Sequence, residues 1–91
     1  MITGMQIRAA RAALRWSVKE LASIAGVGTQ TIKRFEVVEG IPQSRTQTLL
    51  EVKAAFEAAG IEFIGTPEDS PGIRLVSSRS FEKTRLSGAR G

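Results

Sequence analysis

Four polar residues that lie close together in the sequence have side chains suited to binding DNA: Thr29, Gln30, Lys33 and Arg34. A glutamine can make paired hydrogen bonds to adenine, and an arginine can make them to guanine. The spacing places all four on the solvent side of a helix expected over residues 29–37, which would bury Ile32 and Phe35. The alternative is that these residues only solvate the surface of that helix.

Further basic residues are candidates for binding the phosphates of a DNA backbone. Lys19 and Arg45 stand in the first turns of two other expected helices, where backbone N–H groups and the helix dipole also favour an anion. Lys33 is assigned to the same group. Arg8 and Arg15 have two interpretations, as phosphate ligands or as part of a solvated helix face. Phosphate contacts would make binding strongly dependent on salt.

The composition agrees with a polyanionic partner and argues against catalysis. The chain has 91 residues, a formal net charge of +4 and a pI of about 10.4, a balance that favours polyanions without requiring them. It has no cysteine and no histidine, which excludes disulfides, thiolate chemistry and zinc fingers. The sequence offers no nucleophile–base pair, metal-ligand spacing or phosphate-binding glycine loop. We expect no enzyme activity, no catalytic residues, no metal and no cofactor.

The distribution of apolar residues indicates a cytoplasmic protein. No apolar run approaches the roughly 20 residues that a membrane-spanning helix needs, and no signal-peptide core precedes the first helix. We therefore expect no membrane partner.

Helical spacing and capping residues predict four helices, at about 5–15, from Ser17 to Gly26, at 29–37 and at 45–59. Three of them are expected to begin at capping-box spacings, which are Thr3 with Gln6, Ser17 with Glu20, and Ser44 with Gln47. Glycines are expected to end two of them, Gly26 the second helix and Gly60 the fourth.

Each expected helix has an apolar face for the core. The predicted core residues are Ile7, Ala10 and Leu14, then Leu21, Ile24 and Ala25, and finally Leu49, Val52, Phe56 and Ala59. Trp16 lies between the first two helices and is interpreted as an ordinary core residue.

Beyond Gly60 the pattern changes to short β-branched runs at 61–64 and 73–76, separated by a turn-rich loop at 65–72. These predict a β-hairpin, which must pack on a helix or pair with another chain because an isolated hairpin is marginally stable. Residues 77–91 are rich in serine, arginine, lysine and glycine and are expected to form a disordered basic tail. Such a tail is a soluble end or a nonspecific contact with phosphates.

The stretch 17–36 resembles the Cro and phage-repressor-like (XRE-type) helix-turn-helix family, and the resemblance extends over about residues 5–59. The motifs that carry it are the capped second helix with Glu20-Leu21-Ala22, then Ala25-Gly26-Val27, Thr31-Ile32, and Glu36 followed by a glycine-containing loop. The Gly-Ile-Glu-Phe-Ile and Gly-Ile-Arg-Leu segments of the hairpin resemble small bacterial members of this family.

The resemblance implies a mainly α fold, a four-helix lambda-repressor-like domain at 1–60, with a C-terminal hairpin at 61–76 as candidate dimerisation element and the tail at 77–91. It places Thr29, Gln30 and Arg34 at base-reading positions. It also implies a partly buried, structural ion pair between Arg11 and Glu36.

Two positions depart from the family pattern. Val18 stands where a glutamine usually contacts a phosphate and braces the second helix of the motif. Gly28 stands where a serine or threonine usually begins that helix.

These observations predict a sequence-specific DNA-binding regulator of transcription, of bacterial or phage type and expected to act as a repressor. The alternative mode of action is activation, in which the protein binds beside a promoter and recruits the polymerase. Its partner would be double-stranded DNA, and a homodimer would bind a palindromic operator with half-sites about 34 Å apart. The alternative is a helix-turn-helix protein that binds a protein partner, as an anti-activator or an antitoxin does. Val18 and Gly28 keep this alternative open, because both reduce the surface available to DNA.

Overall fold

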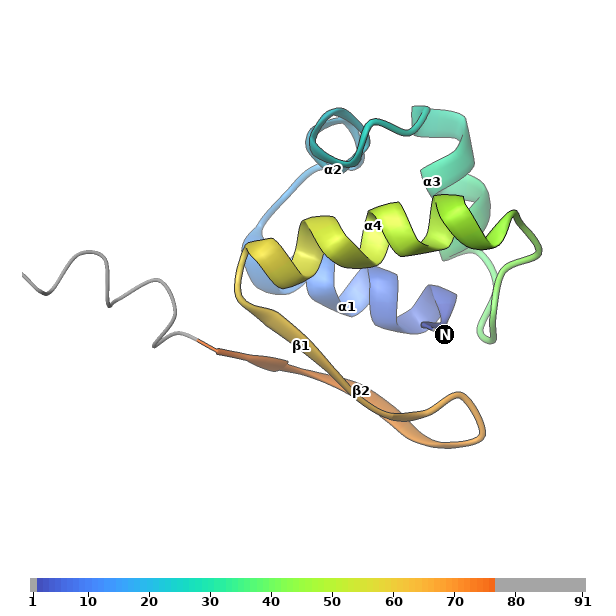
Figure 1. Ribbon diagram of the computed structural model, residues 1–91, viewed down its shortest axis with the longest axis vertical. Coiled ribbons are helices and arrows are strands. Elements are labelled where there is room, and N and C mark those ends of the chain that lie inside the picture. The colour runs from blue at the N-terminus through green and yellow to red at the C-terminus, as the bar shows by residue number, and fades with distance from the viewer. Residues whose placement is uncertain (1, 77–91) are drawn as a thin grey trace, which may run out of the picture.

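Four helices and a two-stranded antiparallel sheet form a mixed α/β structure in the computed structural model, which describes residues 2–76 (Figure 1). The elements are α1 (Gly4–Leu14), α2 (Val18–Ala25), α3 (Thr29–Glu36), α4 (Thr46–Ala58), β1 (Ile61–Thr66) and β2 (Asp69–Leu75). The four expected helices and the hairpin are therefore present. The tail expected at 77–91 lies outside the described residues. No helix within the described part is long and apolar enough to cross a membrane.

Two of the three predicted capping boxes are confirmed. At α1, the amide of Gln6 donates to Thr3 Oγ1 at 3.1 Å, and the amide of Thr3 donates to Gln6 Oε1 at 2.9 Å. At α2, Ser17 and Glu20 make the same reciprocal pair at 3.0 and 2.7 Å. Gly26 ends α2 with φ of 72°, as predicted, a conformation that strains a residue with a Cβ. Local sequence chemistry thus determines where these two helices begin and where α2 ends.

The capping box predicted at Ser44 is wrong. Arg45 is the N-cap of α4 and makes no side-chain capping hydrogen bond. Gln47 donates instead to Glu51 Oε2, one turn further along the helix, at 3.3 Å. Because α4 begins one residue later than the spacing suggested, the Ser44 hydroxyl precedes the capping position.

The core lies between the four helices and β1. Its largest fully buried side chains are Ile7, Leu21, Ile32, Phe35, Leu49, Val52, Phe56 and Ile61. Trp16 stacks on Phe56 with ring centroids 5.7 Å apart, and Phe63 of β1 meets Phe56 edge-on at 5.9 Å. Trp16 therefore packs against the core, and the prediction that it is a core residue is confirmed.

Ile24 was expected in the core, and this expectation is wrong, since 55% of the residue is exposed. The short helix α2 buries Leu21 and Ala22, with Val18 and Ala25 packed beside them. Ile24 lies on the side of α2 next to Leu21, beyond the part of the helix surface that α3 and α4 cover.

The hairpin has longer strands and a shorter loop than the sequence indicated. The register pairs Ile61 with Leu75 and Phe63 with Ile73, and the pairing continues to Thr66 and Asp69. The register of the two strands shifts between Ile64 and Thr66, as at a β-bulge. The loop expected at 65–72 is therefore wrong, because only residues 67–68 lie between the strands.

The hairpin packs on a helix of its own chain, beneath α1 in the view of Figure 1. The side-chain amide of Gln6 donates to the carbonyl oxygens of Ile64, at 3.2 Å, and Gly72, at 2.8 Å. One residue of α1 thus closes its own helix cap and also holds both strands of the hairpin.

The start of α1 lies against the end of α3. The amide of Gly4 donates to the carbonyl oxygen of Gly40 at 2.9 Å. A Cβ atom on Gly4 would lie 2.1 Å from the Val38 carbonyl oxygen and 2.3 Å from that of Phe35. Only glycine allows this approach of the two backbones.

We expect Gly4→Ala to destabilise the protein by about 2–3 kcal/mol, because α1 and α3 must separate to admit the methyl group. Thermal or urea unfolding measures the change. Gly40→Ala is the matched control, since a Cβ there meets nothing within 4 Å, and its effect should stay within about 0.5 kcal/mol. Equal effects of the two substitutions would contradict the close contact at Gly4.

Candidate nucleic-acid interface

Helices α2 and α3 are joined by a tight turn at residues 26–28 and pack against each other. The amide of Val27 donates to the carbonyl oxygen of Ala22 at 2.9 Å, which closes the end of α2. Gly28 is the N-cap of α3, and its carbonyl oxygen accepts hydrogen bonds from the amides of Thr31 and Ile32. The turn therefore presents the N-terminal end of α3 at the surface.

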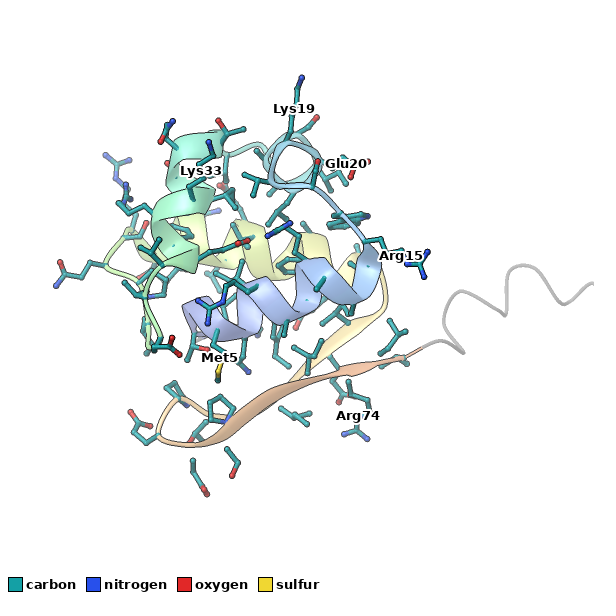
Figure 2. The ribbon with its side chains drawn as sticks, turned by 180° about the vertical axis from the view of Figure 1, so that it is seen from behind. Met5, Arg15, Lys19, Glu20, Lys33 and Arg74 are labelled. Atoms are coloured by element: carbon teal, nitrogen blue, oxygen red, sulfur yellow. The ribbon has the colours of Figure 1, made fainter. Side chains whose placement is uncertain are left out.

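The structure brings the four predicted DNA-binding residues together on one side of α3. Helix α3 buries Ile32, Phe35 and Glu36. The exposed side carries all four candidates, Thr29, Gln30, Lys33 and Arg34. Their spacing by one, three and four residues keeps them on one continuous face opposite the core. Figure 2 shows Lys33 on α3 and Lys19 on α2 at the end of the molecule away from the hairpin.

Eight of the nine basic residues among residues 2–76 fall into two groups by their partners, and the ninth, Arg15, forms no ion pair there and lies outside the candidate interface. Those paired with a carboxylate are Arg8, Arg11, Lys53 and Arg74. Those of the candidate interface are Lys19, Lys33, Arg34 and Arg45, and none of them forms an ion pair within residues 2–76. The interface thus carries positive charge that the described part of the chain does not neutralise by direct contact.

A hollow of about 460 Å³ separates the α2–α3 turn from the start of α4. Arg34 of α3 and Arg45 at the start of α4 both line it, together with Thr31, Thr48 and Glu51. The sequence assigned Arg34 to base reading, and its place at the edge of the α3 face also brings it to this hollow. Sequence reasoning did not single out Thr48 or Glu51, although both follow Arg45 at intervals of three residues.

Arg11 and Glu36 form a bidentate ion pair between α1 and α3. Nε of Arg11 lies 2.8 Å from Glu36 Oε2, and Nη2 lies 3.0 Å from Oε1. The third donor, Nη1, reaches the carbonyl oxygen of Trp16 at 2.9 Å. The hydrogen bond to Glu36 raises the pKa of Arg11, burial opposes that rise, and the charge of Glu36 adds to it. Arg11 therefore stays charged and serves the fold.

Arg8 was interpreted from sequence as a phosphate ligand or a solvated side chain, and the structure gives it another role. Its guanidinium donates to the backbone carbonyl oxygen of Glu36 and lies 3.6 Å from the Glu39 carboxylate. Arg8 and Arg11 are three residues apart on α1, so both reach the end of α3. That spacing was visible in the sequence, but the partners of Arg8 were not. Arg15 is exposed and lies at the C-cap of α1 with φ of 59° (Figure 2).

The two positions that differ from the pattern of the resembled family, Val18 and Gly28, each lie at the start of a helix. Val18 is the first residue of α2 and packs, partly buried, against the core. Gly28 is the N-cap of α3 and provides no side-chain capping bond. Like the start of α4, the start of α3 therefore has backbone N–H groups that no side chain caps.

No protein-family model and no curated protein matches the chain. Among residues 2–76, no group of three acidic, histidine or cysteine side chains is placed to hold a metal ion.

A double-mutant cycle tests the structural role of the Arg11–Glu36 pair. We expect Arg11→Gln and Glu36→Gln each to destabilise the protein by about 2 kcal/mol, since each leaves a charge without its partner near the core. The side chain of Arg11 is 26% exposed, so screening by water keeps the effect below that of a fully buried pair. The coupling energy from chemical unfolding should be about 1–2 kcal/mol.

The matched control is the exposed pair of Arg74 and Glu62, whose nitrogen and oxygen atoms lie 3.3 Å apart on the hairpin. The same cycle there should give a coupling energy below about 0.5 kcal/mol. A coupling energy for Arg11 and Glu36 no larger than this would show that the pair is dispensable to the fold.

Proposed function

We propose that this protein is a helix-turn-helix regulator of transcription, of the Cro and phage-repressor kind, which binds double-stranded DNA with α3 in the major groove. The observation that carries the proposal is the exposed side of α3 and its surroundings. Polar groups suited to base edges share that face, and the basic residues around it have no carboxylate partner among the described residues. Of the five basic residues outside this surface, four are paired with a carboxylate and only Arg15 is not, among the residues that the structure describes.

In this proposal, Thr29, Gln30 and Arg34 read the bases. An α-helix fits the width of the major groove, and the N-terminal residues of the helix approach the base edges. Gln30 would donate to and accept from one adenine, and Arg34 would donate two hydrogen bonds to one guanine. The turn at residues 26–28 supports these roles, because it leaves the first residues of α3 uncovered.

Lys19, Lys33 and Arg45 would bind phosphates and set the position of the protein along the groove. Each is exposed, and Lys19 and Arg45 stand at helix starts, where the dipole also attracts an anion. Binding across a promoter would then block the polymerase, which makes repression by occupancy the mechanism that we propose.

The decisive experiment is a DNA-binding titration in salt, with a duplex selected from random-sequence DNA as the probe. We expect folded protein to bind at low micromolar concentration or below, with an affinity that falls steeply as salt rises. Lys19→Gln and Arg45→Gln should each reduce the slope of log affinity against log salt by about 0.9 per bound protomer. Gln30→Ala should relax the choice of base at one position of the selected site.

Arg74→Gln is the matched control for these charge changes, because Arg74 lies on the hairpin, at the opposite end of the molecule from Lys19 (Figure 2). Its slope should equal that of the wild type. Folded protein that fails to bind DNA, or binds it without salt dependence, would exclude the proposed function.

We also propose that the protein binds a palindromic site as a homodimer, with half-sites about 34 Å apart, and that the hairpin is the dimer element. Each strand of this two-stranded sheet has an outer edge without a strand partner among the described residues, and such edges favour pairing. Leu75 on β2 is 52% exposed. The hairpin already packs on α1, so its own stability does not require the dimer.

Sedimentation analysis tests the dimer. We expect the wild type to sediment as a dimer and Leu75→Glu to sediment as a monomer, because a charge at that position opposes close pairing of two hairpins. Ile24→Glu is the control, since Ile24 is equally exposed, at 55%, but lies on α2. A monomeric wild type, or a dimer that tolerates Leu75→Glu, would exclude this interface.

One observation favours the second candidate function, a helix-turn-helix protein that binds a protein partner. Val37 and Ile41 expose 76% and 43% of their surface just beyond α3. Exposed apolar surface marks a protein contact where it forms a contiguous patch, and these two side chains would contribute to one. The salt titration separates the two functions, since a protein-binding module of this kind would not show the steep dependence expected for DNA.

A further inference from the structure

The hollow beside α3 contains a carboxylate as well as two guanidinium groups. Arg34 lines it from α3 and Arg45 from the N-cap of α4, while Glu51 lines it from the second turn of α4. The hydroxyl groups of Thr31, Ser44 and Thr48 complete the polar lining. The lining of the hollow therefore carries two positive charges and one negative charge.

Glu51 makes only one polar contact within the described part of the chain, the hydrogen bond that Oε2 accepts from Gln47 at 3.3 Å. It forms no ion pair with Arg34 or Arg45 among residues 2–76. Its charge is therefore not cancelled by direct contact and acts on whatever enters the hollow. The structure of the helix does not require a carboxylate at this exposed position, because a glutamine would keep the contact with Gln47.

We infer that Glu51 limits the affinity of this interface for a DNA phosphate bound by Arg45 at the start of α4. The inference rests on the proposed function. A phosphodiester bound by Arg45 in the hollow is attracted by that guanidinium group and repelled by the Glu51 carboxylate, and this repulsion is only partly screened at ordinary salt. Backbone contacts carry no sequence information, so Glu51 lowers the time that the protein spends on non-specific DNA.

The test compares Glu51→Gln with Glu68→Gln on one mixed-sequence duplex. Both substitutions remove one negative charge from an exposed residue, but Glu68 lies in the hairpin turn, away from α3. At low salt, Glu51→Gln should bind about five- to tenfold more tightly than the wild type, and Glu68→Gln less than about twofold more tightly. The thermal unfolding midpoints of both variants should match that of the wild type.

A second pair of variants tests whether the effect of Glu51→Gln depends on Arg45. In an Arg45→Gln background, which removes the guanidinium group that binds the phosphate, Glu51→Gln should gain no more affinity than Glu68→Gln does. Equal effects of Glu51→Gln and Glu68→Gln in the wild-type background would overturn the inference and leave the proposed function intact. Absence of salt-dependent DNA binding in every variant would overturn both.

Discussion

The orientation of α3 in the fold depends on the bonds that Arg11 makes to Glu36, the last residue of α3. One guanidinium binds both oxygens of Glu36 and also the carbonyl oxygen of Trp16, so it joins the end of α3 to the connection between α1 and α2. Arg8 adds a bond to the Glu36 carbonyl oxygen, and the backbones meet at Gly4. Helix α3 is therefore anchored at its C-terminal end, and its N-terminal end stays available at the surface.

This anchoring separates two uses of positive charge in a chain with a net charge of +4. Arg8 and Arg11 are held by carboxylates and by backbone carbonyl oxygens, and they stabilise the contact between α1 and α3. The cations on the exposed side of α3 and at the starts of α2 and α4 have no such partners among the described residues. A basic composition alone could not have distinguished a structural arginine from one that is available to a polyanion.

Local chemistry made much of the fold predictable. The boxes at Thr3 and Ser17 and the glycine at Gly26 each act over a few residues, so the sequence indicated them correctly. The errors at Ser44, at Ile24 and in the hairpin loop have a common origin. Each of these three predictions depended on where an element begins or ends, or on how much of a helix face its neighbours cover. A local sequence pattern does not contain this information.

The sequence by itself determined the number and order of the helices, the hairpin, and the polar face of α3, because periodicity and capping are properties of short segments. Only the tertiary structure decided the partners of Arg8 and the meeting of Arg34, Arg45 and Glu51 in one hollow. These depend on how helices that are distant in sequence pack together. The polar and basic residues of the candidate interface are therefore readable in the sequence, whereas the position of Glu51 beside Arg34 and Arg45 emerges only in the folded chain.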